Sequence, residues 1–205
     1  MLRAHTRDRR FQLTVSPLYA SFLNRRFAGR PPGPMRGFGA GMEVDARVRR
    51  WLWLRGSVSH SVHPVEANAR VEDDGRITPL ASEGAVRSSN FGVGLVYPLD
   101  LGPVLQLIEV GAGGLWITSP GPGHAWGQVG MRCRADGSCD PGLTCAAQNR
   151  CQQRVEPEIH MGLGADWLLG RHLSLGIHLR YYALPGDLQR LPIYLIGGLR
   201  AAARF

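Results

Sequence analysis

The chain has 205 residues and 44% hydrophobic content, which suits one large all-β domain or two small ones with a buried core. Its formal charge of +8 admits an anionic partner such as nucleic acid or lipid phosphate. All 24 basic residues are arginine, a bias that we ascribe to a GC-rich genome and not to function. No run of about 18 apolar residues occurs, so a transmembrane helix is excluded.

Residues 1–10 are charged and contain no apolar core of a secretory signal. From this segment alone we expect either a mature or differently started form of an exported protein, or a cytosolic protein. The absence of a transmembrane helix does not exclude a membrane β-barrel, because the strands of such a barrel are only about 9 to 11 residues long and alternate between apolar and polar residues.

Apolar and polar residues alternate along eight runs of the chain. The runs cover residues 10–22, 37–49, 51–63, 88–98, 104–118, 155–168, 172–184 and 191–205. Side chains alternate faces along a strand, so each run predicts a strand with one apolar face and one polar face. No segment has a convincing helical period, and the predicted fold class is therefore all-β.

The connections between these runs alternate in length. Three are tight, at Arg50, 99–103 and 169–171, and four are longer: 23–36, 64–87, 119–154 and 185–190. In an up-and-down meander successive connections lie at opposite ends, so tight turns gather at one end and loops at the other. Outer-membrane barrels have this sidedness, and eight strands return both termini to the tight-turn end.

Glycines and aromatic residues indicate which face looks inward. A soluble lipocalin-like barrel has apolar side chains inside, whereas a small membrane barrel has them outside. The strand glycines on the polar face are Gly92, Gly94, Gly111, Gly113, Gly162, Gly164, Gly176 and Gly198. Glycines leave room for long side chains in a narrow lumen, which favours the membrane barrel. Aromatic residues near strand ends suit interfacial girdles, namely Tyr19, Trp116, Trp167, Tyr181 and Phe205.

The charges on the polar face nearly balance, because six carboxylates face five guanidiniums when the two histidines are left out of the count. Such mixing favours an enclosed ion-pair network over solvated strand faces, because an unpaired buried charge is costly. The predicted network comprises Glu43, Asp45, Arg47, Arg55, Glu109, Glu156, Glu158, His160, Asp166, His178, Arg180, Arg200 and Arg204. A metal site at His160 and His178 is the weaker alternative, and we expect no metal and no cofactor.

The whole pattern resembles the small eight-stranded outer-membrane barrels of Gram-negative bacteria, the OmpA/OmpW-like β-barrel class. The resemblance covers nearly all of the chain except 119–154. It implies a single-domain (1–205), eight-stranded, antiparallel up-and-down transmembrane β-barrel in the cell outer membrane. Such a protein contacts outer-membrane lipid, has no nucleic-acid partner and is a monomer. The last strand resembles that class's assembly signal, which implies recognition by the barrel-assembly machinery through Tyr194, Gly198 and Phe205.

Four cysteines lie within the longest connection, each separated from the next by five residues: Cys133, Cys139, Cys145 and Cys151. Many of the intervening residues are turn formers, so this segment needs cross-links in place of a core. We predict two disulfides and leave all three connectivities open. Four thiolates also suit tetrahedral zinc, but the equal spacing without a C-x-x-C pair disfavours it. Disulfides fit an oxidising compartment, so 119–154 is predicted to be an extracellular loop insertion.

The expected function is structural, adhesive or surface-binding, without enzyme activity. Eight strands leave an interior just wide enough for side chains, which predicts a plugged lumen and no conducting pore. The alternatives are a soluble lipocalin-like binding barrel and a barrel-embedded lipid-modifying enzyme of the lipase or deacylase type.

The enzyme alternative depends on a Ser/His cluster near the loop end of the third run: Ser59, His60, Ser61 and His63. Adjacent residues of a strand face opposite sides, so a serine nucleophile here is expected to need a histidine from a neighbouring strand. Ordinary rim residues are the favoured interpretation. Four arginines in the first long connection suit lipid phosphates, although a solvated loop is the simpler account: Arg25, Arg26, Arg30 and Arg36.

Overall fold

The structure is a computed structural model. It describes residues 10–22, 35–65, 68–71, 77–81, 84–118, 126–127, 131–139, 143–153, 155–185 and 193–205. Across these ranges, no helix has the length and apolar character needed to cross a membrane.

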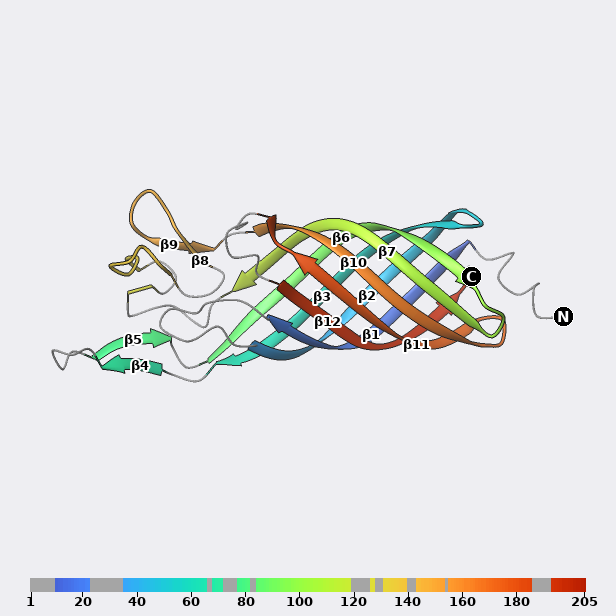
Figure 1. Cartoon of the computed structure of the whole chain (residues 1–205), viewed down its shortest axis with the longest axis horizontal. Helices are drawn as coiled ribbons and strands as arrows, with labels where there is room; N and C mark the ends of the chain where they lie inside the picture. Colours follow the sequence, from blue (N-terminus) through green and yellow to red (C-terminus); the bar gives the residue numbers. More distant parts are fainter. Residues whose placement is uncertain are drawn as a thin grey trace.

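Eight long antiparallel strands close into a barrel (Figure 1). They are β1 (Phe11–Phe22), β2 (Met35–Arg49), β3 (Leu52–Val65), β6 (Gly84–Asp100), β7 (Val104–Thr118), β10 (Val155–Leu169), β11 (Leu173–Ala183) and β12 (Ile193–Arg204). Each strand pairs with the barrel strand before and after it in the chain, and β1 closes the ring on β12. The predicted eight-stranded up-and-down barrel is confirmed, and closure leaves no open strand edge.

Two short hairpins lie outside the barrel. One pairs β4 (Asn68–Val71) with β5 (Ile77–Ala81), and the other pairs β8 (Leu143–Cys145) with β9 (Cys151–Gln153). Both lie at the end opposite the C-terminus (Figure 1). The sequence did not predict these hairpins, because strands of three to five residues are too short to establish an alternation.

The predicted sidedness of the connections is confirmed. At the tight-turn end, β2 joins β3, β6 joins β7 and β10 joins β11 through two or three residues. Gly102 and Gly170 adopt positive φ angles of 86° and 87° in two of these turns. Glycine reaches this left-handed region without a Cβ clash, which allows such abrupt reversals.

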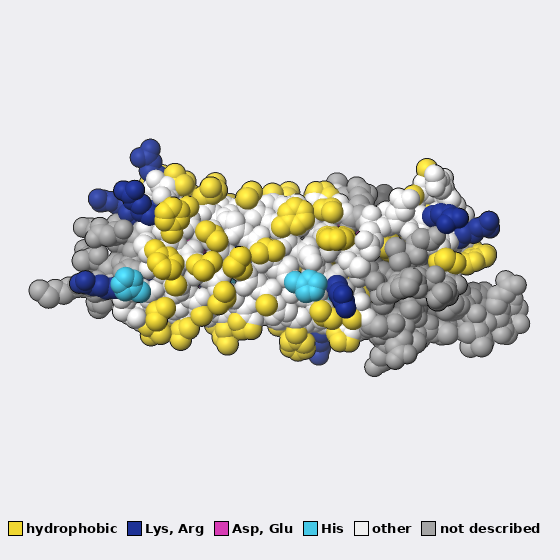
Figure 2. All heavy atoms as spheres, turned by 180° about the vertical axis from the view of Figure 1, so that it is seen from behind, with side chains coloured by type: hydrophobic (Ala, Val, Ile, Leu, Met, Phe, Trp, Pro, Cys, Tyr) yellow, Lys and Arg dark blue, Asp and Glu magenta, His cyan; other side chains and the backbone are white. Residues whose placement is uncertain are grey.

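The outer wall of the barrel is apolar, and the inner wall is polar at mid-height. Along β11, Leu175, Ile177 and Leu179 are exposed, whereas the alternate residues His178 and Arg180 are buried. Apolar side chains cover the barrel wall between its two ends (Figure 2). This orientation is opposite to that of a lipocalin, so the soluble binding barrel is ruled out. An apolar exterior of this kind is suited to lipid.

Candidate functional site

Arg55 of β3 lies at the centre of the buried charges. The β2–β3 register places it opposite Asp45, and its Nε and Nη2 donate to the two carboxylate oxygens of Asp45 at 2.6 and 2.8 Å. Its Nη1 donates to Glu109 Oε2 at 2.9 Å and lies 3.2 Å from Glu43 Oε2. Arg55 is only 1% exposed, so three carboxylates replace the water that its charge would otherwise bind.

Two further arginines reach the same carboxylates from the other side of the barrel. Arg180 of β11 places Nη2 2.7 Å from Glu43 Oε1 and 2.8 Å from Glu109 Oε2. Arg200 of β12 lies 3.2 Å from Glu43 and 3.4 Å from Asp166 of β10. Glu43 and Glu109 are therefore shared acceptors that tie β2, β3, β7, β11 and β12 together across the lumen.

The network of buried charges extends from Glu109 to His160 and Glu158 of β10. His160 lies between two carboxylates, with Nδ1 3.0 Å from Glu158 and Nε2 3.3 Å from Glu109. Gly111 faces this imidazole, and a Cβ on Gly111 would collide with its Nε2. The lumen glycine thus supplies the space that the histidine occupies, as the sequence predicted for the polar face.

Ten of the thirteen predicted network residues contact one another through ion pairs. They are Glu43, Asp45, Arg55, Glu109, Glu158, His160, Asp166, Arg180, Arg200 and Arg204. His178 is also buried in the lumen beside Arg180 and Arg200, and its Nδ1 has no hydrogen-bond partner among the described residues. Arg47 and Glu156 are half-buried on the same inner face, towards opposite ends of the barrel.

Apolar layers lie above and below the charged residues of the lumen. The sequence had predicted a polar inner face along the whole barrel, so these two layers were not predicted. At the loop end the layer consists of Leu18, Ala20, Phe22, Val86, Leu115, Ile117, Tyr182, Leu184, Tyr194 and Ile196. At the tight-turn end it consists of Trp53, Val96, Leu105 and Leu107, with Leu168 packed against them. The sequence did contain a signal for the first layer. Leu18 and Ala20 are even-numbered positions of β1, like the inward residues Gln12 and Thr14, so apolar residues at the inner face could have been recognised.

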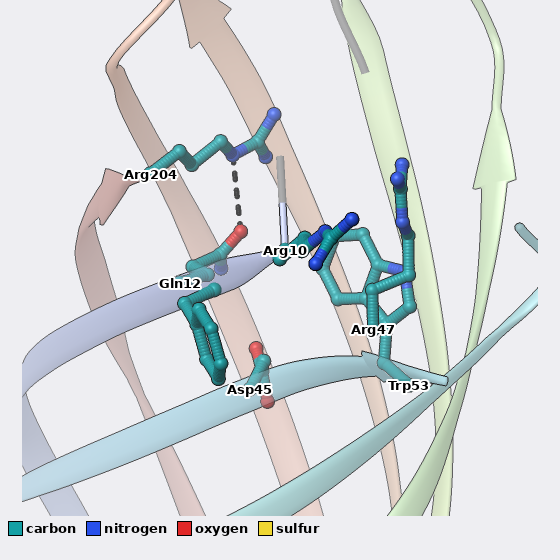
Figure 3. A pocket seen from close by; sticks show the side chains of 7 residues that line it. Arg10, Gln12, Asp45, Arg47, Trp53 and Arg204 are labelled. Atoms are coloured by element: carbon teal, nitrogen blue, oxygen red, sulfur yellow. Dashed lines mark hydrogen bonds between the residues drawn. The ribbon is translucent and has the colours of Figure 1, made fainter. Parts of the chain in front are cut away.

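Two small cavities lie beside these side chains in the described part of the lumen. A cavity beside His178 and Arg180 measures about 10 Å³. Another, at the tight-turn end near Trp53 and Arg204, measures about 20 Å³ (Figure 3). Here Arg204 Nε of β12 donates to Gln12 Oε1 of the neighbouring strand β1 at 3.0 Å. Each cavity has room for about one water molecule.

Part of the predicted Ser/His cluster forms a buried hydrogen-bonded group in the loop-end layer. Ser61 Oγ lies 2.9 Å from His63 Nε2, 2.6 Å from Ser88 Oγ and 2.7 Å from Tyr194 OH. The expectation that the serine needs a histidine from another strand was wrong for this pair, because residues i and i+2 of one strand share a face. Phe22 stacks on Tyr194 with ring centroids 4.3 Å apart and closes over the group.

The rest of that cluster is divided between the two walls. Ser59 lines the small lumen cavity beside His178. His60 faces outward, and its Nδ1 lies 2.9 Å from Ser89 Oγ of β6. This outward pair is the cross-strand meeting of a serine and a histidine that the enzyme alternative required.

All four cysteines form disulfides, so the predicted cross-links are confirmed. The pairs are Cys133–Cys145 and Cys139–Cys151, which settles the connectivity that the sequence left open. Between them Asp136 accepts hydrogen bonds from Ser138 Oγ at 2.6 Å and Ser138 N at 2.9 Å. These bonds favour the charged carboxylate and hold the pKa of Asp136 below its ordinary value.

The three residues of the predicted assembly signal lie on different faces of β12 and its end. Tyr194 and Gly198 face the lumen, where Tyr194 is 1% exposed. Phe205 is 68% exposed. Its backbone N–H donates to Phe11 O at 2.9 Å, and its carbonyl accepts from Arg10 N at 2.9 Å, so β12 and β1 stay paired to this residue.

The sequence matches no protein-family model and no curated protein. Solved structures are similar in fold. Neisserial surface protein A is 14% identical, with 95% of each chain covered and a TM-score of 0.53. The N-terminal β-barrel domain of Pseudomonas aeruginosa OprF is 8% identical, with 95% of this chain and 97% of that chain covered and a TM-score of 0.50. The attachment invasion locus protein Ail of Yersinia pestis is 10% identical, with 96% and 99% covered and a TM-score of 0.49.

Replacing Arg55 is expected to destabilise the barrel. Arg55→Met leaves Asp45, Glu43 and Glu109 short of one shared cation, and we expect a loss of about 3–5 kcal/mol in the free energy of unfolding. Adding Glu109→Gln should recover part of the loss, because one fewer charge is left unpaired. Urea titration in lipid vesicles, followed by tryptophan fluorescence, measures both effects.

Arg50→Met, at an exposed turn position, is the matched control and should change stability by about 0.5 kcal/mol or less. Equal losses for Arg55→Met and Arg50→Met would contradict a central role of the lumen network.

Proposed function

We propose that this chain, which has the fold of the small outer-membrane β-barrels, is a non-conducting outer-membrane protein that presents a binding surface at its loop end. The observation that carries the proposal is the filling of the lumen by an apolar layer, a charged layer and a second apolar layer. An interior filled in this way serves as a rigid support, so the chemistry of recognition falls to the segments outside the barrel.

The packing of the described residues supports a barrel without a conducting path. An ion crossing the barrel would have to pass the Phe22 and Tyr194 layer, the Arg55 network and the Trp53 layer in turn. Each apolar layer disfavours water, and the guanidinium–carboxylate pairs neutralise much of one another's charge without bound ions. The small cavities between these layers hold about one water each.

The surface role is supported by the structure outside the barrel. The β4–β5 and β8–β9 hairpins both lie at the loop end, and two disulfides cross-link the second of them. Disulfides persist in oxidising compartments, which supports an extracellular position for this end. We therefore propose that the Cys-rich segment 119–154 binds a partner, and that its disulfide-linked residues Cys133, Cys139, Cys145 and Cys151 stabilise that surface.

Assembly and oligomeric state belong to the same proposal. The closed ring leaves no strand edge free, which supports a monomer surrounded by outer-membrane lipid. The barrel-assembly machinery is the proposed partner during biogenesis, with β12 as the recognised strand through Tyr194, Gly198 and Phe205. We propose no enzyme activity.

A lipid-modifying enzyme is the second candidate, because His60 and Ser89 meet on the lipid-facing wall. Within the described residues no carboxylate binds His60 to complete a catalytic triad, so we rank it second. Release of fatty acid from vesicle lipid by the purified protein, abolished by Ser89→Ala, would establish this activity.

The first test of the proposed function is electrical. The full chain, shown to be folded by heat-modifiable migration in detergent, is expected to give no discrete conductance steps in a planar lipid bilayer. The filled lumen is the reason. Steps whose size grows with salt concentration would contradict the plugged barrel.

The second test uses the absence of lysine. A lysine introduced as Gln148→Lys, in the exposed β8–β9 turn, should react with a membrane-impermeant amine reagent on intact cells. The matched variant Arg50→Lys, in the β2–β3 turn, should react only after the cells are opened. Mass spectrometry separates either label from one on the N-terminal amine. Labelling of Arg50→Lys on intact cells would reverse the proposed orientation.

A further inference from the structure

Among the described residues, polar side chains interrupt the apolar outer wall on one side of the barrel near the loop end. Near the loop end, outward positions of β2, β3, β6 and β7 carry polar side chains: Arg36, His60, Arg87, Ser89 and Thr118. At the same end, described outward positions of β10, β11 and β12 are apolar or aromatic: Val155, Pro157, Ile159, Tyr181 and Leu195. An ordinary interfacial girdle surrounds a barrel on all sides, so a one-sided patch needs another explanation.

Strand register brings three of these polar groups together. His60 is directly opposite Ser89, and Arg87 is opposite Val62, one outward step nearer the loops. Outward positions on one strand are about 6.8 Å apart, and diagonal cross-strand neighbours are about 7–8 Å apart. A guanidinium on Arg87 can therefore reach the space above the His60–Ser89 hydrogen bond of 2.9 Å.

The patch carries positive charge without a protein counterion. Within the described part of the chain, neither Arg36 nor Arg87 forms an ion pair with a carboxylate. Figure 2 shows basic side chains and histidine beside the apolar belt, and no acidic side chain is visible on that face. A cation at the edge of hydrocarbon is costly unless an anion meets it, so the patch requires an anionic partner.

A groove lies in the outer wall next to the polar patch, on the side of the patch that faces the tight-turn end. The groove, of about 540 Å³, is open to the outside, and its lining includes Met42, Val44, Gly56, Val58, Phe91 and Val93. Gly56 lies at its floor, where a Cβ would meet no atom within 4 Å. The Val58–Phe91 pair forms the groove's upper part, and the His60–Ser89 pair is the next outward step on the same two strands. Apolar groove and cationic patch are thus continuous.

We propose that this wall binds one phosphate-bearing lipid of the surrounding leaflet. The phosphate accepts hydrogen bonds from Arg87, whose planar guanidinium suits two phosphate oxygens, and from His60 and Ser89. Arg36 adds charge from β2, and an acyl chain occupies the groove over Gly56. This inference rests on the proposed function, since it requires the wall to face lipid.

The occupant is a membrane lipid and not free phosphate, because two features coincide. Free phosphate would use the cationic patch and leave the apolar groove unfilled. A neutral lipid would use the groove and leave Arg87 unneutralised, and the phosphate of a zwitterionic lipid is already neutralised by the cation of its own headgroup. Only a lipid with an anionic headgroup satisfies both.

The experiment reconstitutes the full chain into vesicles of phosphatidylcholine with a minor fraction of phosphatidylglycerol. After gentle detergent extraction, native mass spectrometry counts the lipids that each protein molecule retains. The wild type should retain one phosphatidylglycerol in preference to phosphatidylcholine, and added inorganic phosphate should not displace it. Displacement by inorganic phosphate would overturn the lipid as the occupant.

Two variants test the two halves of the site separately. His60→Gln combined with Arg87→Gln removes the Arg87 charge and the His60 imidazole, and Gly56→Leu fills the groove. Each should lower retention by about tenfold, the usual scale for losing charge-assisted hydrogen bonds or a chain-sized apolar contact. Arg50→Gln and Gly197→Leu, which make the same changes at the tight-turn end and on β12, are the matched controls and should retain the lipid.

The outcomes separate this inference from the proposed function. A chain that fails to insert into vesicles contradicts the membrane barrel itself. A chain that inserts and folds, yet retains phosphatidylglycerol no better than phosphatidylcholine, overturns the lipid site alone. Equal losses in Arg50→Gln and in the His60/Arg87 variant would also overturn it, because retention would then follow net charge.

Discussion

The constraint on which the structure depends is that buried charges in a narrow closed lumen must neutralise one another. Glu43 and Glu109 each contact at least two guanidiniums that come from strands on different sides of the ring. The Arg180–Glu43 contact joins β11 to β2 and cannot form until β1 pairs with β12, so barrel closure and charge neutralisation depend on each other. The lumen glycines belong to the same constraint, since Gly111 provides the space in which His160 lies. The network therefore selects one strand order and one register.

Period-two alternation explains why the barrel was predictable from sequence. In β7 the predicted and observed bounds coincide, and in the middle of the strand apolar residues alternate with Glu109, Gly111 and Gly113. The inward direction of Arg55 and Arg180 follows from the same parity. The apolar layers at the two lumen ends were missed for a physical reason, since parity gives the face of a residue and not its depth along the barrel axis.

Contacts between strands distant in sequence were not predictable from one chain. The meeting of Tyr194 with Ser61 requires residues 133 positions apart to lie at the same height. The outward His60–Ser89 pair likewise depends on the register between β3 and β6. A connection as long as 66–83 does not fix that register, so the pair could not be predicted from the sequence. The disulfide connectivity depends on how the Cys-rich segment reverses, and equal spacing of the cysteines does not distinguish the possibilities.

The two disulfides interleave along the chain, because Cys139 lies between Cys133 and Cys145, and Cys145 lies between Cys139 and Cys151. Any single break of the backbone between residues 133 and 151 is therefore spanned by at least one disulfide. An exposed loop of a cell-surface protein meets proteases, and most loops lose their shape when they are cut once. A chain cut once between these cysteines would therefore stay attached at both ends of the cut for as long as the disulfides stay oxidised.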